Sequence, residues 1–281
     1  MELHTRAIGA RQLCPVYGLS LGFATKRDCG PSIRHYLGMS AADAEPMTPA
    51  YRVVVALGAP VMWPWSRLRV SGLEHLPASG PTLLIANHDS YWDPIAIAVA
   101  ARHRRQVRAL AKSTIWKLRP IGWLMDGMGH IPIERGAGDT GAIEAAVREL
   151  RAGACIGVFP EGTRSLGREL RARSGAGRLL LAVPQARIVC ARVTGTTDVV
   201  RLPKRPWVTV EFFAPAGGRP KPGESATELM ARLPAELRDG APPTVPGRRR
   251  TAAKFRVRLE SGYAPLDVEA GHRGVPNRTA V

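Results

Sequence analysis

From residue 81 onward, short apolar runs of strand length alternate with segments of helical periodicity. The expected strands are 82–86, 107–111, 154–159, 187–193 and 207–213. The clearest helix, 142–151, has Asp139 or Thr140 available as its cap and Gly153 beyond its end. This alternation predicts an α/β layer architecture.

The ends of the chain differ from this middle part. Residues 1–46 show no sustained period, which predicts a poorly ordered extension before a domain at 47–240, and translation from Met47 is a hypothesis. Segment 225–239 is expected to be a weaker helix that Pro234 interrupts. Residues 241–281, rich in Arg, are expected to form a basic, disordered tail.

The charge balance favours an anionic partner. Forty Lys and Arg face 23 Asp and Glu, for a formal charge of +17. Nucleic acid, a phosphorylated metabolite and an acidic membrane all qualify, although the excess of Arg over Lys is also typical of a GC-rich genome. The four cysteines lack CxxC spacing, so neither a disulfide scaffold nor a structural zinc is expected.

The chain could lie on a membrane, but no membrane span is predicted. The first thirty residues lack a signal-peptide pattern, so secretion is not expected. The apolar stretch 53–65 is below the roughly 18 to 20 residues that cross a bilayer. Trp63 and Trp65 fit interfacial anchors, but an ordinary helix with core tryptophans explains them equally well.

Polar residues follow the first strand, where α/β sheets place their active sites. His88 and Asp93 are five residues apart, with Pro94 next. Asp93 could simply cap the following helix. Alternatively, the turn folds back, and Asp93 holds one ring nitrogen of His88 so that the other can take a proton.

Two further segments carry candidate ligands for an anion. After the strand at 154–158, Phe-Pro-Glu-Gly-Thr-Arg-Ser at 159–165 offers a glycine backbone, a hydroxyl and a guanidinium, although Glu161 could pair with Arg164 in a plain surface turn. In the extended run 129–135, alternation puts Ile131 and Ile133 on one face, and Arg135 either binds an anion or neutralises Glu134.

Taken together and in this order, the three segments resemble the glycerolipid acyltransferase family that includes the 1-acylglycerol-3-phosphate acyltransferases. Residues 88–93 match its HxxxxD motif, 159–165 its FPEGTRS block, and 129–135 its intermediate motif ending in Arg. The likeness runs from about residue 53 to about residue 213. It departs near 187–193, where Cys190 replaces a proline, which leaves acyl-chain or acceptor preference open.

The resemblance implies a layered fold like that of glycerol-3-phosphate acyltransferase, with a mixed sheet flanked by helices. His88 would be the general base, oriented by Asp93, for direct attack of a lysophosphatidate hydroxyl on an acyl thioester. The residues implied for phosphate binding are Lys112, Arg135, Glu161, Gly162, Thr163 and Arg164. Acyl-CoA or acyl carrier protein would be the co-substrate, with no metal or other cofactor, at the cytoplasmic face of an anionic membrane.

Three alternatives compete with this interpretation. Residues 18–22 fit the GxSxG pattern of serine esterases, but too little chain precedes them for the sheet that this motif requires. A nucleic-acid or membrane-surface binding module would explain the charge, but no recognised nucleic-acid motif accompanies it, so no nucleic acid is expected. Transfer to another lysophospholipid or a glycolipid hydroxyl is the runner-up among enzyme functions.

Overall fold

A computed structural model describes residues 46–134, 139–201, 203 and 205–245 of the 281-residue chain. All described residues belong to one compact unit, 41–281. The predictions made for residues 1–45 and 246–281, the GxSxG segment among them, therefore lie outside the described residues, as does Arg135.

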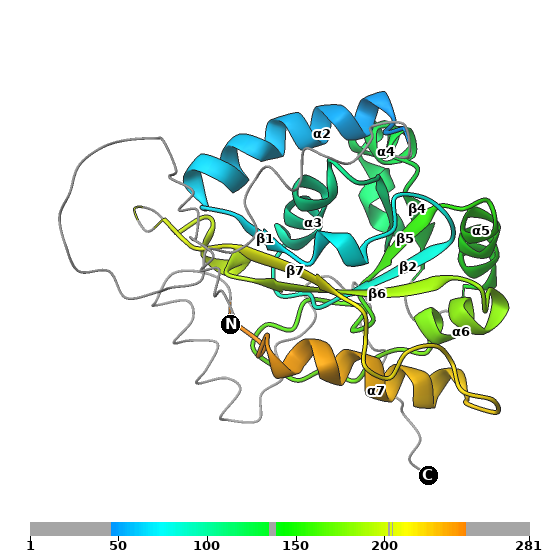
Figure 1. The fold of residues 1–281 in the computed structure, drawn as a ribbon. Helices are drawn as coiled ribbons and strands as arrows, with labels where there is room; N and C mark the ends of the chain where they lie inside the picture. The colour runs from blue at the N-terminus through cyan, green and yellow to red at the C-terminus, as the bar shows by residue number, and fades with distance from the viewer. Residues whose placement is uncertain (1–45, 135–138, 202, 204, 246–281) are drawn as a thin grey trace, which may run out of the picture. The chain divides into compact units, whose positions relative to one another are not determined.

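A mixed seven-stranded sheet forms the centre of the described fold (Figure 1). Its order is β1-β7-β6-β2-β5-β3-β4, and β6 and β7 run antiparallel while every other neighbouring pair is parallel. The strands are β1 Arg69–Ser71, β2 Thr82–Ala86, β3 Val107–Lys112, β4 Ile131–Ile133, β5 Cys155–Val158, β6 Arg187–Thr194 and β7 Thr209–Phe213. The carboxyl ends of β6, β2, β5, β3 and β4 therefore meet at one edge.

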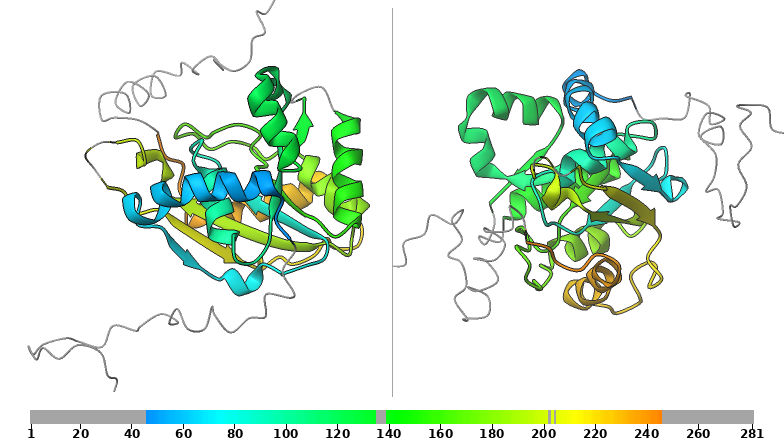
Figure 2. Two further views of the ribbon diagram at one scale, coloured as in Figure 1. Left: turned by 90° about the horizontal axis from the view of Figure 1, so that it is seen from above. Right: turned by 90° about the vertical axis from the view of Figure 1, so that its left-hand side faces the viewer.

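Helices cover both faces of the sheet, as Figures 1 and 2 show. On one face lie α2 Pro49–Pro60 with its π-helical continuation η2 Val61–Trp65, α3 Asp93–Ala101 and α4 Arg119–Gly127. The other face carries α5 Thr140–Arg151, α6 Gly175–Ala182 and α7 Ala226–Asp239. Short 3-10 turns complete the set: η3 Leu73–His75, η4 Ser113–Lys117 and η5 Thr196–Asp198.

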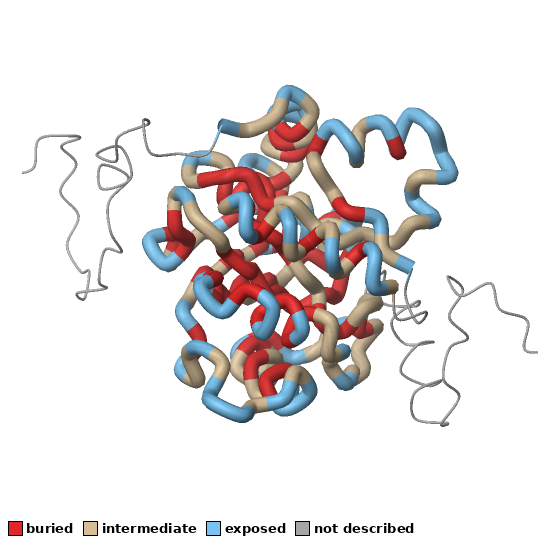
Figure 3. Tube along the Cα trace, turned by 90° about the vertical axis from the view of Figure 1, so that its right-hand side faces the viewer, coloured by how far each residue is buried: buried red, intermediate tan, exposed pale blue. Residues whose placement is uncertain are grey.

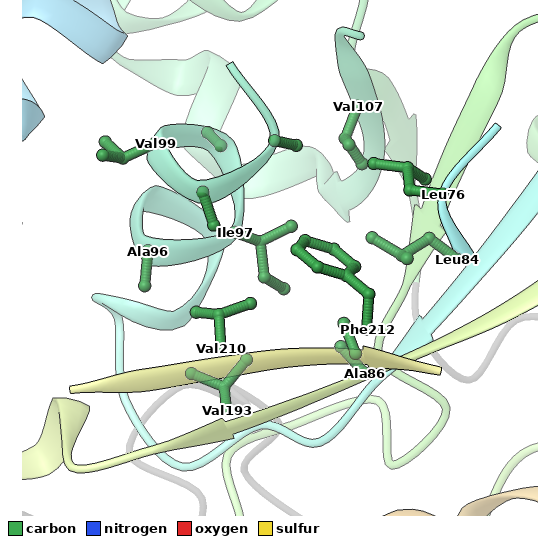
Figure 4. Packing of buried hydrophobic residues seen from close by; sticks show 14 of the residues in the cluster. Leu76, Leu84, Ala86, Ala96, Ile97, Val99, Val107, Val193, Val210 and Phe212 are labelled. Carbon is green, nitrogen blue, oxygen red and sulfur yellow. The ribbon is translucent and has the colours of Figure 1, made fainter. Parts of the chain in front are cut away.

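Two apolar clusters fill the space between the sheet and these helices. Because side chains alternate along a strand, Leu84 of β2 packs toward α3 while Leu83 packs toward the α5–α7 face. Figure 4 shows Phe212 of β7 close to Ile97 of α3. Figure 3 shows that the buried residues are concentrated in this interior. Full burial of a large apolar side chain such as Leu84 or Phe212 stabilises the fold by about 1.5 to 3 kcal/mol.

The predicted α/β class and mixed sheet are confirmed, and the five predicted strands correspond to β2, β3, β5, β6 and β7. Asp139 caps α5, since its side chain accepts the N–H of Ala142. The predicted interruption at Pro234 is wrong, because α7 continues through it. A capping box of Ser225 and Glu228 starts this helix, which buries four apolar side chains: Leu229, Met230, Leu233 and Leu237.

Candidate active site

The loop after β2 is tied to β6 by Asn87. Its side-chain Nδ2 donates to the Val193 carbonyl at 2.8 Å, and its Oδ1 accepts the Val193 N–H at 2.8 Å. The Asn87 side-chain amide therefore takes the place of a backbone partner for Val193 at the point where β2 ends. His88, the next residue, is fixed at the carboxyl edge of the sheet.

His88 and Asp93 form a buried pair at this edge. The His88 Nδ1 lies 3.0 Å from Asp93 Oδ2, and the two side chains are 10% and 0% exposed. Asp93 Oδ2 also accepts the backbone N–H groups of Asp89 at 2.7 Å and Ser90 at 2.8 Å, and the Thr196 hydroxyl donates to Asp93 Oδ1. The carboxylate thus organises the whole turn.

The capping interpretation of Asp93 fails on geometry. Helix α3 begins at Asp93 with Trp92 in the cap position and no side-chain capping bond, and Pro94 lies in its first turn. The Asp93 carboxylate faces backward, to the amides of the turn and to the imidazole. With Nδ1–H donated to Asp93, the Nε2 atom of His88 is the one that can accept a proton.

The 159–165 turn packs directly against the His88 turn. The Phe159 ring stacks on the imidazole, with ring centroids 4.3 Å apart and an interplanar angle of 26°. The Ser165 N–H donates to the His88 carbonyl at 2.8 Å, and its hydroxyl donates to Asp89. Two motifs about seventy residues apart in sequence are therefore interlocked here.

Two buried carboxylates, Asp89 and Glu161, share one guanidinium, that of Arg238 in α7. Arg238 Nη1 donates to both Asp89 oxygens at 2.9 and 3.1 Å, and its Nε donates to Glu161 Oε1 at 2.6 Å. Burial raises the pKa of Glu161 to about 7, against the attraction of Arg238, and the charges of Asp89 and Asp93 act in the same direction as burial.

Gly162, Thr163 and Arg164 lie at the more open side of this turn. Gly162 has a φ of 71°, and a Cβ there would come within 2.5 Å of Arg173 Nε, so both conformation and space favour glycine. The Arg164 guanidinium lies over the Tyr91 ring, 3.7 Å from its centroid, and its Nη2 donates to the Tyr91 hydroxyl at 3.0 Å. Glu161 pairs with Arg238, and not with Arg164 as in the plain-turn interpretation.

The remaining predicted ligands come from the β3 and β4 ends of the same edge. Lys112 is the last residue of β3 and pairs in register with Ile133 of β4. No described contact joins Lys112 to the His88 turn. Cys190 is buried on the α5–α7 face, where burial raises the pKa of its thiol to about 12. Within the described ranges, no group of three or more His, Cys, Asp or Glu forms a potential metal site.

Several residues of this site were not predicted. Asn87 and Ser165 lie inside the motifs, while Thr196 and Arg238 come from segments remote in sequence. Arg238 gives no signal of its own, because a basic residue in the last turn of a helix is explained by the helix dipole. Asp89 was visible only as a second acidic residue beside His88.

Comparisons with known proteins relate this chain to acyltransferases. A family model described as Acyltransferase matches residues 67–194. The chloroplast 1-acyl-sn-glycerol-3-phosphate acyltransferase of Arabidopsis thaliana is 30% identical over 107 residues, 37% of this chain and 29% of that protein. The enzyme of the same name from Bacillus subtilis is 23% identical over 186 residues, 66% of this chain and 81% of that protein.

The fold has a solved counterpart. The 1-acyl-sn-glycerophosphate acyltransferase PlsC of Thermotoga maritima superposes with a TM-score of 0.56 at 21% identity, over 68% of this chain and 77% of that one. The chain spans less than a third of the length of the plant relatives that it matches. The matched model and its paired motifs make residues 67–194 an acyltransferase domain, similar to that of the 1-acyl-sn-glycerol-3-phosphate acyltransferases.

Proposed function

We propose that this protein transfers a fatty acyl group from a thioester donor to the free hydroxyl of 1-acyl-sn-glycerol-3-phosphate, forming phosphatidic acid. The donor is acyl-CoA or an acyl carrier protein. The observation that carries the proposal is the 3.0 Å pair of His88 and Asp93, enclosed by the 159–165 turn. The relatives that bear the name of this activity add support.

His88 acts as the general base. Asp93 orients the imidazole through Nδ1, so Nε2 removes the proton of the acceptor hydroxyl as its oxygen attacks the thioester carbonyl. A C–O bond forms, the C–S bond breaks, and the thiolate takes the proton back from the imidazolium. The His88 base is regenerated without a covalent acyl-enzyme.

The phosphate of the acceptor binds beside this base. Arg164 supplies a guanidinium and Thr163 a hydroxyl, while Gly162 gives the turn its left-handed conformation, and a phosphomonoester carries about −1.5 to −2 charges at neutral pH. Lys112, at the carboxyl edge of the sheet, and Arg135 are proposed to add positive charge. Glu161 contributes indirectly, because a carboxylate bound to Arg238 repels a phosphate and can only shape the turn.

We also propose that the protein acts at an anionic membrane surface, since both the acceptor and the product are lipids. In the part of the chain that the structure describes, no helix is long and apolar enough to cross a membrane. Trp63 is 41% exposed and can contact lipid, whereas Trp65 is partly buried and donates to the Val199 carbonyl at 2.8 Å. One of the two predicted anchors is therefore a packing residue.

The activity is tested with His88→Ala, and His103→Ala serves as the matched control because His103 is an exposed histidine just beyond α3. We expect phosphatidate formation from lysophosphatidate to fall about a thousandfold in His88→Ala and to stay near wild type in the control. Both donors and a panel of other lysolipids are assayed side by side. Near-normal kcat in folded His88→Ala would remove the general base, and transfer only to another lysolipid would replace the acceptor.

A further inference from the structure

The last turn of α7 places one guanidinium between two loops of the site. Arg238 contacts Asp89, which neighbours His88, through Nη1, and contacts Glu161 through Nε and Nη2. Asp89 lies 149 residues and Glu161 lies 77 residues away in sequence. Arg238 thus adds a third element, α7, to two turns that the Ser165 hydroxyl and the Phe159 ring already join.

These contacts are sheltered from water. The Asp89 and Glu161 side chains are 5% and 4% exposed, and Arg238 is 17% exposed. Two carboxylates this close and this buried repel each other, and the penalty is relieved only by a shared cation or by a proton. Arg238 supplies that cation, in a planar fork that a lysine cannot reproduce.

The position of Arg238 is itself fixed. Arg192 of β6 donates to the carbonyls of Glu236 at 2.8 Å and Leu237 at 3.3 Å, which anchors the last turn of α7 to the sheet. Leu233 and Leu237 are buried on the same helix. The guanidinium therefore approaches the two loops from a rigid support.

We propose that Arg238 is a positioning residue for acyl transfer: by binding Asp89 and Glu161 together, it holds the turn that carries His88 against the turn that carries Thr163 and Arg164. This inference rests on the proposed function. Arg238 touches neither substrate nor donor and acts through the two carboxylates. Without it, the Ser165 and Phe159 contacts remain, but the two buried carboxylates lose their shared cation and repel each other. The two turns then shift relative to one another, and misplacement by about 1 Å can cost about a hundredfold in rate.

The test compares Arg238→Ala and Arg238→Lys with Arg232→Ala. Arg232 lies on the same helix and pairs with Glu224 at 2.7 and 3.0 Å, so its removal also breaks a two-bond ion pair. We expect kcat per folded molecule to fall about tenfold to a hundredfold in Arg238→Ala, with KM for lysophosphatidate within about threefold. Arg238→Lys restores kcat only in part, and Arg232→Ala keeps kcat near wild type.

Chemical rescue separates positioning from a merely structural role. Guanidinium at low-millimolar concentration is expected to raise kcat of Arg238→Gly severalfold, at constant folded fraction by circular dichroism, and to leave Arg232→Ala unchanged. Wild-type kcat in either folded Arg238→Ala or Arg238→Lys would overturn the proposal. If Arg238→Ala does not fold, the test uses Arg238→Lys, which keeps the positive charge and loses only the planar guanidinium that binds both carboxylates.

A readout without activity distinguishes this inference from the proposed function. Arg238, Asp89 and Asp93 are the charged groups that face Glu161. Carboxyl carbon NMR, assigned with Glu161→Gln, is expected to show the Glu161 titration move to higher pH in Arg238→Lys, and an unmoved titration would contradict the bridge. If the titration moves but the wild type transfers no acyl group to any acceptor, the proposed function fails while the contact stands.

Discussion

Tyr91 positions the guanidinium of Arg164, one of the proposed phosphate ligands. The Tyr91 hydroxyl accepts a hydrogen bond from Arg164 at 3.0 Å, which helps to hold the guanidinium that is proposed to bind the phosphate. The central carbon of the Arg164 guanidinium lies 3.7 Å from the centroid of the Tyr91 ring, and this stacking keeps the guanidinium in one orientation. Tyr91 is 62% exposed, so this arrangement is not required by packing.

The change Tyr91→Phe keeps the ring and removes the hydroxyl. We expect KM for lysophosphatidate to rise about threefold to tenfold with little change in kcat, because one hydrogen bond to a charged group is lost. Arg164→Ala is expected to raise it further. Steady-state kinetics with a phosphorylated acceptor and an unphosphorylated one check this, and equal losses on both acceptors would contradict a phosphate role.

At the scale of single elements, the junction of β3 and β4 contains a histidine that must stay neutral. The His130 Nδ1 accepts the Ala109 N–H of β3 at 3.0 Å, and burial lowers its pKa to about 4. Between about pH 6.5 and 4, His130 is therefore protonated in the unfolded chain but neutral in the folded protein. The contribution of this site to the free energy of unfolding is intact above that window and declines as the pH falls through it.

Replacing His130 with asparagine keeps an acceptor for Ala109 and removes the titration. Between pH 7.5 and 5, we expect the wild type to lose up to about 2 kcal/mol more unfolding free energy than His130→Asn, measured by urea denaturation at each pH. The exposed His75→Asn is the matched control. Parallel pH profiles for wild type and His130→Asn would contradict this assignment.

The same elements show what the sequence can predict. Strands β2, β5 and β6 are buried on both faces, so their uninterrupted apolar runs are visible in the sequence. Strands β1 and β4 have three residues each, too few for a pattern. His88 and Asp93 could be paired in advance because one turn joins them, whereas the bridge from Arg238 depends on how α7 docks, which no local pattern encodes.

At the scale of the whole described unit, apolar side chains remain exposed on the α2–α4 side of the sheet. The most exposed are Leu57 of α2 at 72%, Trp123 of α4 at 76% and Leu118 at 62%. The two helices contact each other, since a Cβ on Gly127 would meet Ala50 at 2.8 Å. Exposed Lys117 and Arg119 accompany Leu118. Apolar groups bordered by positive charge suit the surface of an anionic bilayer.

This surface is tested with Leu57→Ser and Trp123→Ser, and with Leu181→Ser as the matched control. Leu181 is 42% exposed on α6, on the opposite side of the sheet (Figure 1). We expect each of the first two changes to weaken binding to phosphatidylglycerol-containing vesicles about threefold to tenfold, since each removes apolar area from the lipid contact. Sedimentation of the protein with these vesicles measures the effect.

Added salt is expected to lower the binding because Lys117 and Arg119 contribute electrostatically, and the protein is expected to bind neutral phosphatidylcholine vesicles more weakly. Equal weakening by Leu181→Ser, or equal binding to neutral vesicles, would assign the membrane contact to some other part of the chain.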